Sequence, residues 1–404
     1  MEDQTIYSSQ ESKISSEASV VEPLAKRNEI HESVRSSRSF GVGCFHFGIK
    51  KKPPYKFTTF EYINEVEAFL QGVPNVTNIV IDQELVENEI IELAERTHIC
   101  QTTFPTFSYL NIQFEIYIPT RLQERFGSGH KHKPGSVCEK FRVSIVDEYY
   151  CPVTFVEPLD LKPGEDPCQS IIVVRKFLQE QSKKSESDFI EFQYLGPSPF
   201  HANLCIKPSQ ESNDVFWFFE VDILDTGDYD LIEIYYDAES FNDIEEAKDY
   251  IFEEIGQELG LFYCYHQIHN IQAYEWSKVK GIFDQIIQIQ KRKDIFGSLS
   301  RYFSSSKLRD AFISIAEFES EQLFYSTQIE DSYRNTYSSE RPSLVLKKYV
   351  DDTIQSRVEY PTRSLLELAN LFEGRREKAV ESVIVLISAI LGGVVGALLT
   401  VFFT

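Results

Sequence analysis

The chain has 404 residues and a formal net charge of −23, because 63 Asp and Glu residues outnumber 40 Lys and Arg residues. A strongly acidic surface repels a phosphate backbone, so this charge excludes a general nucleic-acid-binding protein, and we expect no nucleic-acid partner. Hydrophobic residues make up 42% and aromatic residues 13% of the chain, which is enough for one or two buried cores and excludes a chain that is disordered throughout.

Residues 1–40 are the first segment that composition sets apart. They contain ten serines, charges of both signs and no sustained hydrophobic period. Such a segment cannot bury enough apolar surface to offset the entropy lost on ordering, so the composition predicts a flexible, Ser-rich tail. The tail is either passive or a segment for phosphorylation or docking.

Residues 41–240 are expected to form an α+β domain, because short β-like runs alternate there with a few helices. The clearest strand runs from Leu110 to Ile118, where apolar and polar residues alternate. This period of two is typical of a strand that buries one face and exposes the other to water. One-sided alternation favours a mixed or antiparallel sheet over a doubly wound parallel sheet.

Two further elements of this domain are expected from local patterns. Residues 215–224 and 229–236 predict a β-hairpin, because Gly227 between them supplies the positive φ of a tight turn. A helical stretch is expected before the strand at Leu110, with Ile90 and Leu93 on its apolar side.

Residues 241–378 are expected to form a helical stalk. Apolar residues recur there every three or four positions, which is the period of an amphipathic helix. The clearest runs are Ile244 to Leu259, Val279 to Ile286 and Leu308 to Ile315. A fourth run follows Pro361, a residue favoured at the start of a helix, and leads into the last segment.

Residues 379–404 predict one C-terminal transmembrane helix. The 23 residues from Ser382 to Thr404 are uncharged, and a helix of that length extends about 34 Å, enough to cross a hydrocarbon layer of about 30 Å. Basic residues prefer the cytoplasmic flank of a membrane, and three of them precede the run. We therefore expect a single-pass, tail-anchored membrane protein whose N-terminal body lies on the cytosolic side and whose partners include the lipid bilayer. The basic residues are Arg375, Arg376 and Lys378.

Gly392 and Gly396 form a GxxxG pair in this segment. Such a pair lets two helix backbones approach closely, which indicates a homo-oligomer that packs through this face. Glycine is also common in membrane helices without any such role, so both interpretations stay open.

Two clusters have the residue types of a metal site. Cys264, His266 and His269 lie close together in sequence and have the nitrogen and sulfur ligands that a soft metal prefers. Aromatic residues surround this cluster, and packed core residues are the alternative. The second cluster supplies carboxylate oxygens for a hard cation such as calcium, although a turn followed by a solvated strand also explains it. Its residues are Asp225, Asp228 and Asp230.

No motif identifies a catalytic residue or a cofactor. The sequence contains no phosphate-binding GxxxxGK[ST] loop and no GxSxG, HExxH or EF-hand pattern. Its seven cysteines are an odd number without a CxxC pair, which is typical of reduced core thiols. The cofactor is unknown, and binding is favoured over enzymatic activity.

The acidic charge is concentrated in residues 211–260, which contain 17 acidic side chains and one basic side chain, Lys248. A segment with this charge attracts basic surfaces, so we expect either a basic protein partner or a solvated face.

These features favour a scaffold or sensor protein whose cytosolic α+β domain binds a ligand or partner. Two other functions stay open: an oligomeric membrane effector or channel with a cytosolic sensor domain, and a membrane-attached enzyme of unrecognised class.

Overall fold

The structure is a computed structural model, and it describes most of the chain after the expected Ser-rich tail. Residues 1–36 of that tail lie outside the described residues. The described residues are 37–51, 54–82, 88–93, 110–126, 138–147, 151–161, 167, 170–185, 187–196, 198–209, 221–224, 230–291, 305–337 and 345–403.

A mixed β-sheet forms the centre of the body. Within the described residues it has eight strands in the order β11-β12-β10-β1-β8-β7-β6-β4. Neighbouring strands are antiparallel except β10 and β12, which are parallel. The expected α+β class with a mixed sheet is therefore confirmed. The strands are β1 (Arg38–Gly43), β4 (Val76–Asp82), β6 (Leu110–Tyr117), β7 (Lys140–Asp147), β8 (Val153–Pro158), β10 (Ala202–Pro208), β11 (Val221–Leu224) and β12 (Asp230–Tyr236).

Two expected elements appear in this sheet. Strand β6 alternates buried and half-buried residues along its length, as its period of two predicts. Strands β11 and β12 form the expected antiparallel pair, with Leu224 opposite Leu231. Residues 225–229, which join these two strands, lie outside the described residues.

Two short ladders lie beside the large sheet. Strand β2 (Phe45–Ile49) pairs with β9 (Ile190–Tyr194), and β3 (Tyr55–Thr58) pairs with β5 (Ile90–Leu93). The expected helix through Ile90 and Leu93 is wrong, because these residues form β5. The neighbouring isoleucines at 90 and 91 are β-branched, and such side chains fit a strand better than a helix.

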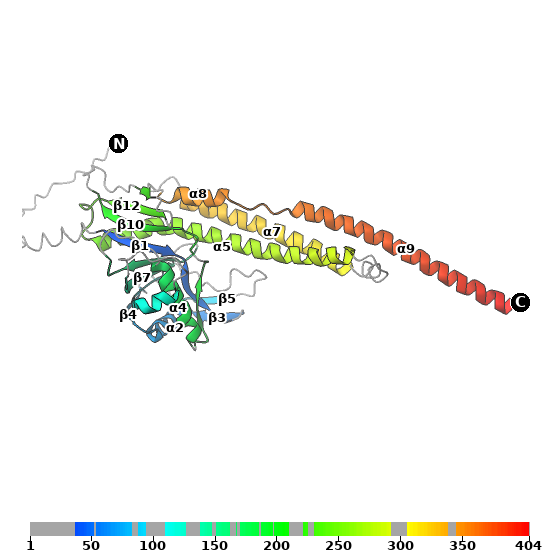
Figure 1. The fold of residues 1–404 in the computed structure, drawn as a ribbon, viewed down its shortest axis with the longest axis horizontal. Coiled ribbons are helices and arrows are strands. Elements are labelled where there is room, and N and C mark those ends of the chain that lie inside the picture. Colours follow the sequence, from blue (N-terminus) through cyan, green and yellow to red (C-terminus); the bar gives the residue numbers. More distant parts are fainter. Residues whose placement is uncertain are drawn as a thin grey trace, which may run out of the picture.

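Helices cover both faces of the sheet (Figure 1). Helix α2 (Thr59–Gly72) begins at a capping box, in which Thr58 Oγ1 accepts a hydrogen bond from the Glu61 backbone while the Glu61 carboxylate accepts one from the Thr58 backbone. Helices α2 and α4 (Ser170–Lys184) pack on one face and share a core with β6 and β7, and α3 (Thr120–Phe126) adds Phe126 to it.

Helix α5 (Ile244–Lys291) covers the opposite face. Its first half shares a second core with β1, β8, β10 and β12. The rings of Phe155 in β8 and Phe252 in α5 stack there with centroids 3.7 Å apart and an angle of 8° between their planes. The core thus extends across the boundary expected between residues 240 and 241.

Beyond the sheet, α5 runs beside α7 (Ser305–Thr336), followed by α8 (Lys347–Gln355) and α9 (Thr362–Phe403) (Figure 1). The runs expected at 244–259 and 279–286 belong to the single helix α5. A third core joins α5, α7 and the first part of α9, and its buried residues are Val279, Phe283, Ile286, Leu308, Ala311, Ile315, Phe318, Ala369 and Phe372.

The expected transmembrane helix is wrong. Within the described part of the chain, no helix combines the length and the apolar character needed to cross a membrane. Helix α9 begins with residues 362–381, eight of which are charged. The single-pass, tail-anchored membrane localisation with a cytosolic body is therefore unsupported.

The stacked pair between β8 and α5 gives a stability prediction. Replacing Phe155 by Ala should lower the free energy of unfolding by about 3–5 kcal/mol, because the change removes a buried ring and leaves a cavity. Urea denaturation followed by circular dichroism measures the loss. The matched control is Phe60→Ala, whose ring is 41% exposed, and it should change stability by only about 0.5 kcal/mol. Equal losses in the two variants would contradict this account of the core.

Candidate functional site

The predicted soft-metal cluster lies on α5, but its residues point in different directions. Cys264 is buried in the core that α5 shares with the sheet, together with Cys151. The His266 ring instead packs on Phe262, with centroids 4.5 Å apart. Residues two positions apart on a helix do not face each other, which separates Cys264 from His266.

The electrostatics of this region follow from burial. Burial and the nearby His269 and His201 lower the pKa of His266 to about 4, so His266 is neutral at pH 7. Hydrogen bonding to Cys264 and burial raise the pKa of the Cys151 thiol. Among the residues with described positions, no group of three or more His, Cys, Asp or Glu side chains is arranged to hold a metal ion. The soft-metal site stays a prediction without an assembled ligand set.

Of the three predicted hard-cation ligands, the structure describes only Asp230. Asp225 and Asp228 lie outside the described residues, whereas Asp230 accepts a hydrogen bond of 3.1 Å from the Tyr349 hydroxyl and so connects β12 to α8. The hard-cation site stays a prediction.

The basic residues expected beside a membrane lie in the middle of α9. Arg376 pairs with Glu373 one turn earlier, Arg375 precedes it, and the Lys378 carbonyl accepts a hydrogen bond from Ser382. Apart from the neighbouring residues and backbone of its own helix, no described atom lies within 4 Å of the position that a Cβ on Gly392 would occupy; the surroundings of Gly396 lie outside the described residues. Self-association through the two glycines stays a prediction.

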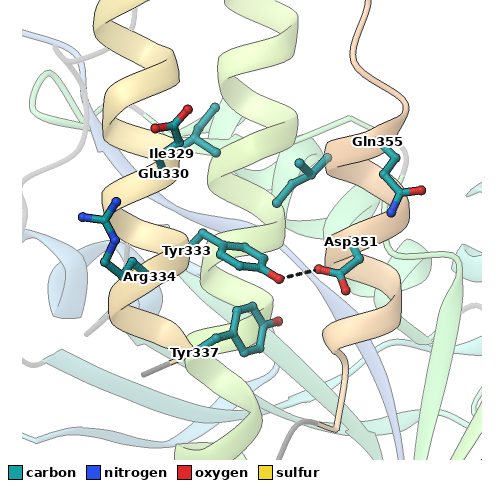
Figure 2. Close-up of a pocket in the computed structure, with 8 residues that line it drawn as sticks. Ile329, Glu330, Tyr333, Arg334, Tyr337, Asp351 and Gln355 are labelled. Carbon is teal, nitrogen blue, oxygen red and sulfur yellow. Dashed lines mark hydrogen bonds between the residues drawn. The ribbon is translucent and has the colours of Figure 1, made fainter. Parts of the chain in front are cut away.

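The structure shows a different candidate site between α7 and α8. An open pocket of about 760 Å³ lies there, and Figure 2 shows two tyrosines projecting toward α8 from the C-terminal end of α7 and the residue that follows it. Both apolar and charged side chains line it, a combination typical of ligand sites. The lining residues are Ile329, Glu330, Tyr333, Arg334, Tyr337, Asp351, Ile354 and Gln355.

The spacing of the two tyrosines explains their contact. Tyr333 lies in the last turn of α7 and Tyr337 directly follows the helix, and the Tyr337 N–H donates a hydrogen bond of 3.0 Å to the Tyr333 carbonyl, so the two residues are neighbours on one helix face. Their ring centroids lie 4.8 Å apart, and the ring planes meet at 57°. The Tyr333 hydroxyl donates a hydrogen bond of 2.7 Å to Asp351 Oδ1 on α8 (Figure 2). This bond fixes one ring against the neighbouring helix.

Lys347, the first residue of α8, places its ammonium group beside both rings. Its Nζ lies 4.9 Å from the Tyr337 centroid, within the range of cation–π attraction, and 5.0 Å from the Tyr333 centroid, at the hydroxyl end of that ring. The same ammonium lies 2.9 Å and 3.1 Å from the two Asp351 carboxylate oxygens and also donates to the Tyr333 hydroxyl. The bonds to Tyr333 and Asp351 raise the pKa of Lys347, so its side chain stays charged.

Glu258 connects this cluster to α5. Its side chain is buried, and Oε2 accepts hydrogen bonds of 3.0 Å from both the Tyr337 hydroxyl and the Leu346 backbone. Burial raises the pKa of Glu258 to about 7, although both bonds oppose the shift. Its Oε1 atom has no hydrogen-bond partner among the described residues. A titratable carboxyl group thus lies behind the tyrosine pair.

Sequence reasoning did not identify this cluster. The signal was present as two four-residue spacings, Tyr333 with Tyr337 and Lys347 with Asp351. Nothing in the sequence shows that these two helix faces meet.

Comparison of the chain with known protein families, with curated proteins and with solved structures finds no match.

The raised pKa of Glu258 predicts a pH dependence of stability. The folded pKa of about 7 exceeds the ordinary value of 4.5, so the folded state binds this proton more tightly than the unfolded state. Stability from this group is fully present below about pH 4.5 and is lost as the pH rises to about 7, a change of roughly 3 kcal/mol at about 1.4 kcal/mol per pKa unit.

Glu258→Gln removes this titration, so its free energy of unfolding should fall less than that of the wild type between pH 5 and pH 8 in urea titrations. Glu253→Gln, an exposed change on the same helix, should keep the wild-type slope. A wild-type slope in Glu258→Gln would contradict the assignment.

Proposed function

We propose that the protein is a binding protein, a scaffold or sensor, and that the pocket between α7 and α8 is its partner site. The observation that carries this proposal is the cluster of Tyr333, Tyr337 and Asp351 around an ammonium group at an open pocket. Tyrosine is enriched at protein interfaces because its ring supplies contact area while its hydroxyl keeps a hydrogen bond.

The partner we propose is basic. The whole chain carries a formal charge of −23, which attracts positively charged molecules over long distances. At the pocket, Asp351 and the exposed Glu330 provide local carboxylates. Two cations lie at the pocket among the described residues: the Arg334 guanidinium lies 3.5 Å from Asp331, and the Lys347 ammonium is paired with Asp351. Complementary charges of this kind guide the encounter and set the orientation of the partner.

The helices supply a firm support for such a site. Helix α8 is held to α5 by a hydrogen bond of 3.3 Å from the Tyr265 hydroxyl to the Ile354 carbonyl, and to β12 by the bond between Tyr349 and Asp230. Phe200 packs its ring against Tyr349 with centroids 5.4 Å apart. A site on helices that are packed in this way loses little freedom when a partner binds.

An octalysine peptide tests this proposal. Fluorescence anisotropy at low salt should show that Glu330→Gln weakens octalysine binding about threefold or more, because the variant removes a carboxylate at the pocket. Glu124→Gln on α3 makes the same change of charge at an exposed position of the sheet domain and should leave the affinity within about 1.5-fold of the wild type.

Equal weakening by the two variants would show attraction to the overall charge alone, and it would overturn the proposed site. Octaglutamate serves as the second probe, and it should not bind the wild type or either variant.

A further inference from the structure

We infer that the pocket between α7 and α8 is a lysine-recognition site, in which Lys347 holds the place of a partner lysine until that lysine displaces it. This inference rests on the proposed function and names the chemical group that the site selects.

The contacts of Lys347 show which chemical group the site accepts. Two aromatic rings lie within 5.0 Å of its Nζ, and one carboxylate contacts the same atom through both oxygens. The Tyr337 ring attracts a cation, and the Tyr333 hydroxyl and the Asp351 carboxylate accept its hydrogen bonds. A neutral side chain of the same length would gain neither interaction. The arrangement therefore selects an ammonium group on a flexible alkyl chain.

The Lys347 side chain can leave the site without unfolding of α8. It is the first residue of α8, and 33% of its side chain is exposed. The lysine side chain has a flexible four-carbon stem, so its ammonium can move into water by a change of rotamer while the backbone stays in place. Leu346 and Val350, which anchor this end of α8, are buried in the core shared by the sheet and α5.

The pocket has room for the side chain of a second lysine. About 760 Å³ is open beside the tyrosines, and Ile329 and Ile354 supply apolar contacts there for an alkyl stem. Tyr337 is held from behind by Glu258, and Tyr333 is held by Asp351, so both rings stay in position after Lys347 leaves. An incoming lysine then meets the same two rings and the same carboxylate.

The decisive probe is Nα-acetyl-lysine amide, with Nα-acetyl-norleucine amide as its neutral analogue. Lys347→Met keeps an apolar stem and removes the ammonium, so it should bind the lysine amide at least fivefold more tightly than the wild type in an NMR titration. The norleucine amide should not bind this variant measurably. Lys347→Arg keeps a cation beside the rings and should show no gain.

A second change tests the carboxylate. Adding Asp351→Asn to Lys347→Met should reverse the gain, because the incoming ammonium then loses its charged partner. Circular dichroism establishes that each variant is folded. The inference is overturned if folded Lys347→Met gains no affinity for the lysine amide, or if it binds the norleucine amide equally well.

A measurement on the unaltered protein covers the case in which Lys347→Met does not fold. Saturation with octalysine should change the chemical shift of the Lys347 ε-methylene, because these protons leave the neighbourhood of the two rings. An unchanged signal at saturation overturns displacement. Choline, tested in parallel, reports whether a quaternary ammonium enters the same place, and binding of choline without the lysine amide would also overturn selection of lysine.

The two proposals fail separately. If Glu330→Gln weakens octalysine binding selectively while Lys347→Met gains nothing, the basic-partner site stands and displacement of Lys347 falls. If octalysine binding is insensitive to Glu330, the proposed function falls, whatever the result with the lysine amide.

Discussion

The packing of α5 against the large sheet is the contact on which the other parts of the structure depend. Phe155 and Phe252 lie at this contact, and buried residues from four strands surround them. Burying apolar side chains is the main stabilising term of a fold, so this core fixes the direction in which α5 leaves the body. Helices α7, α8 and α9 then take their positions from α5 and not from the sheet alone, as the cores that they share with it show.

The candidate site is a consequence of that arrangement. Glu258 on α5 contacts Tyr337 at the end of α7 and the Leu346 backbone at the start of α8, so one buried carboxyl group connects three segments of the chain. Burial of such a group is costly unless it is hydrogen-bonded, and the two donors reduce that cost. The Glu258 carboxyl group also holds the Tyr337 ring in its place beside Lys347. The stability of the helix junction and the shape of the pocket therefore depend on shared residues.

The sequence predicted the parts of this fold that local periodicity controls. The alternation in β6 and the antiparallel pairing of β11 with β12 followed from a period of two and from turn chemistry. The helix expected at Ile90 failed because a short apolar run fits either element, and its pairing with β3 is a contact between residues more than 30 positions apart. The uncharged run after Ser382 led to a membrane helix that the described residues do not support. The site itself required knowledge of helix packing, because Tyr337 and Glu258 are separated by 79 residues.

The length of α5 has a mechanical consequence. Its 48 residues extend roughly 70 Å, of which about 50 Å lie beyond Glu258. The helix therefore resembles a lever whose short arm is packed on one face of the sheet. A tilt of only about 5° at the sheet displaces the far end by roughly 4 Å over that distance. The cluster of Val279, Phe283 and Phe318 at this far end would carry the displacement to α7 and α9 together. Small rotations at the body are thereby amplified into movements of the distal helices.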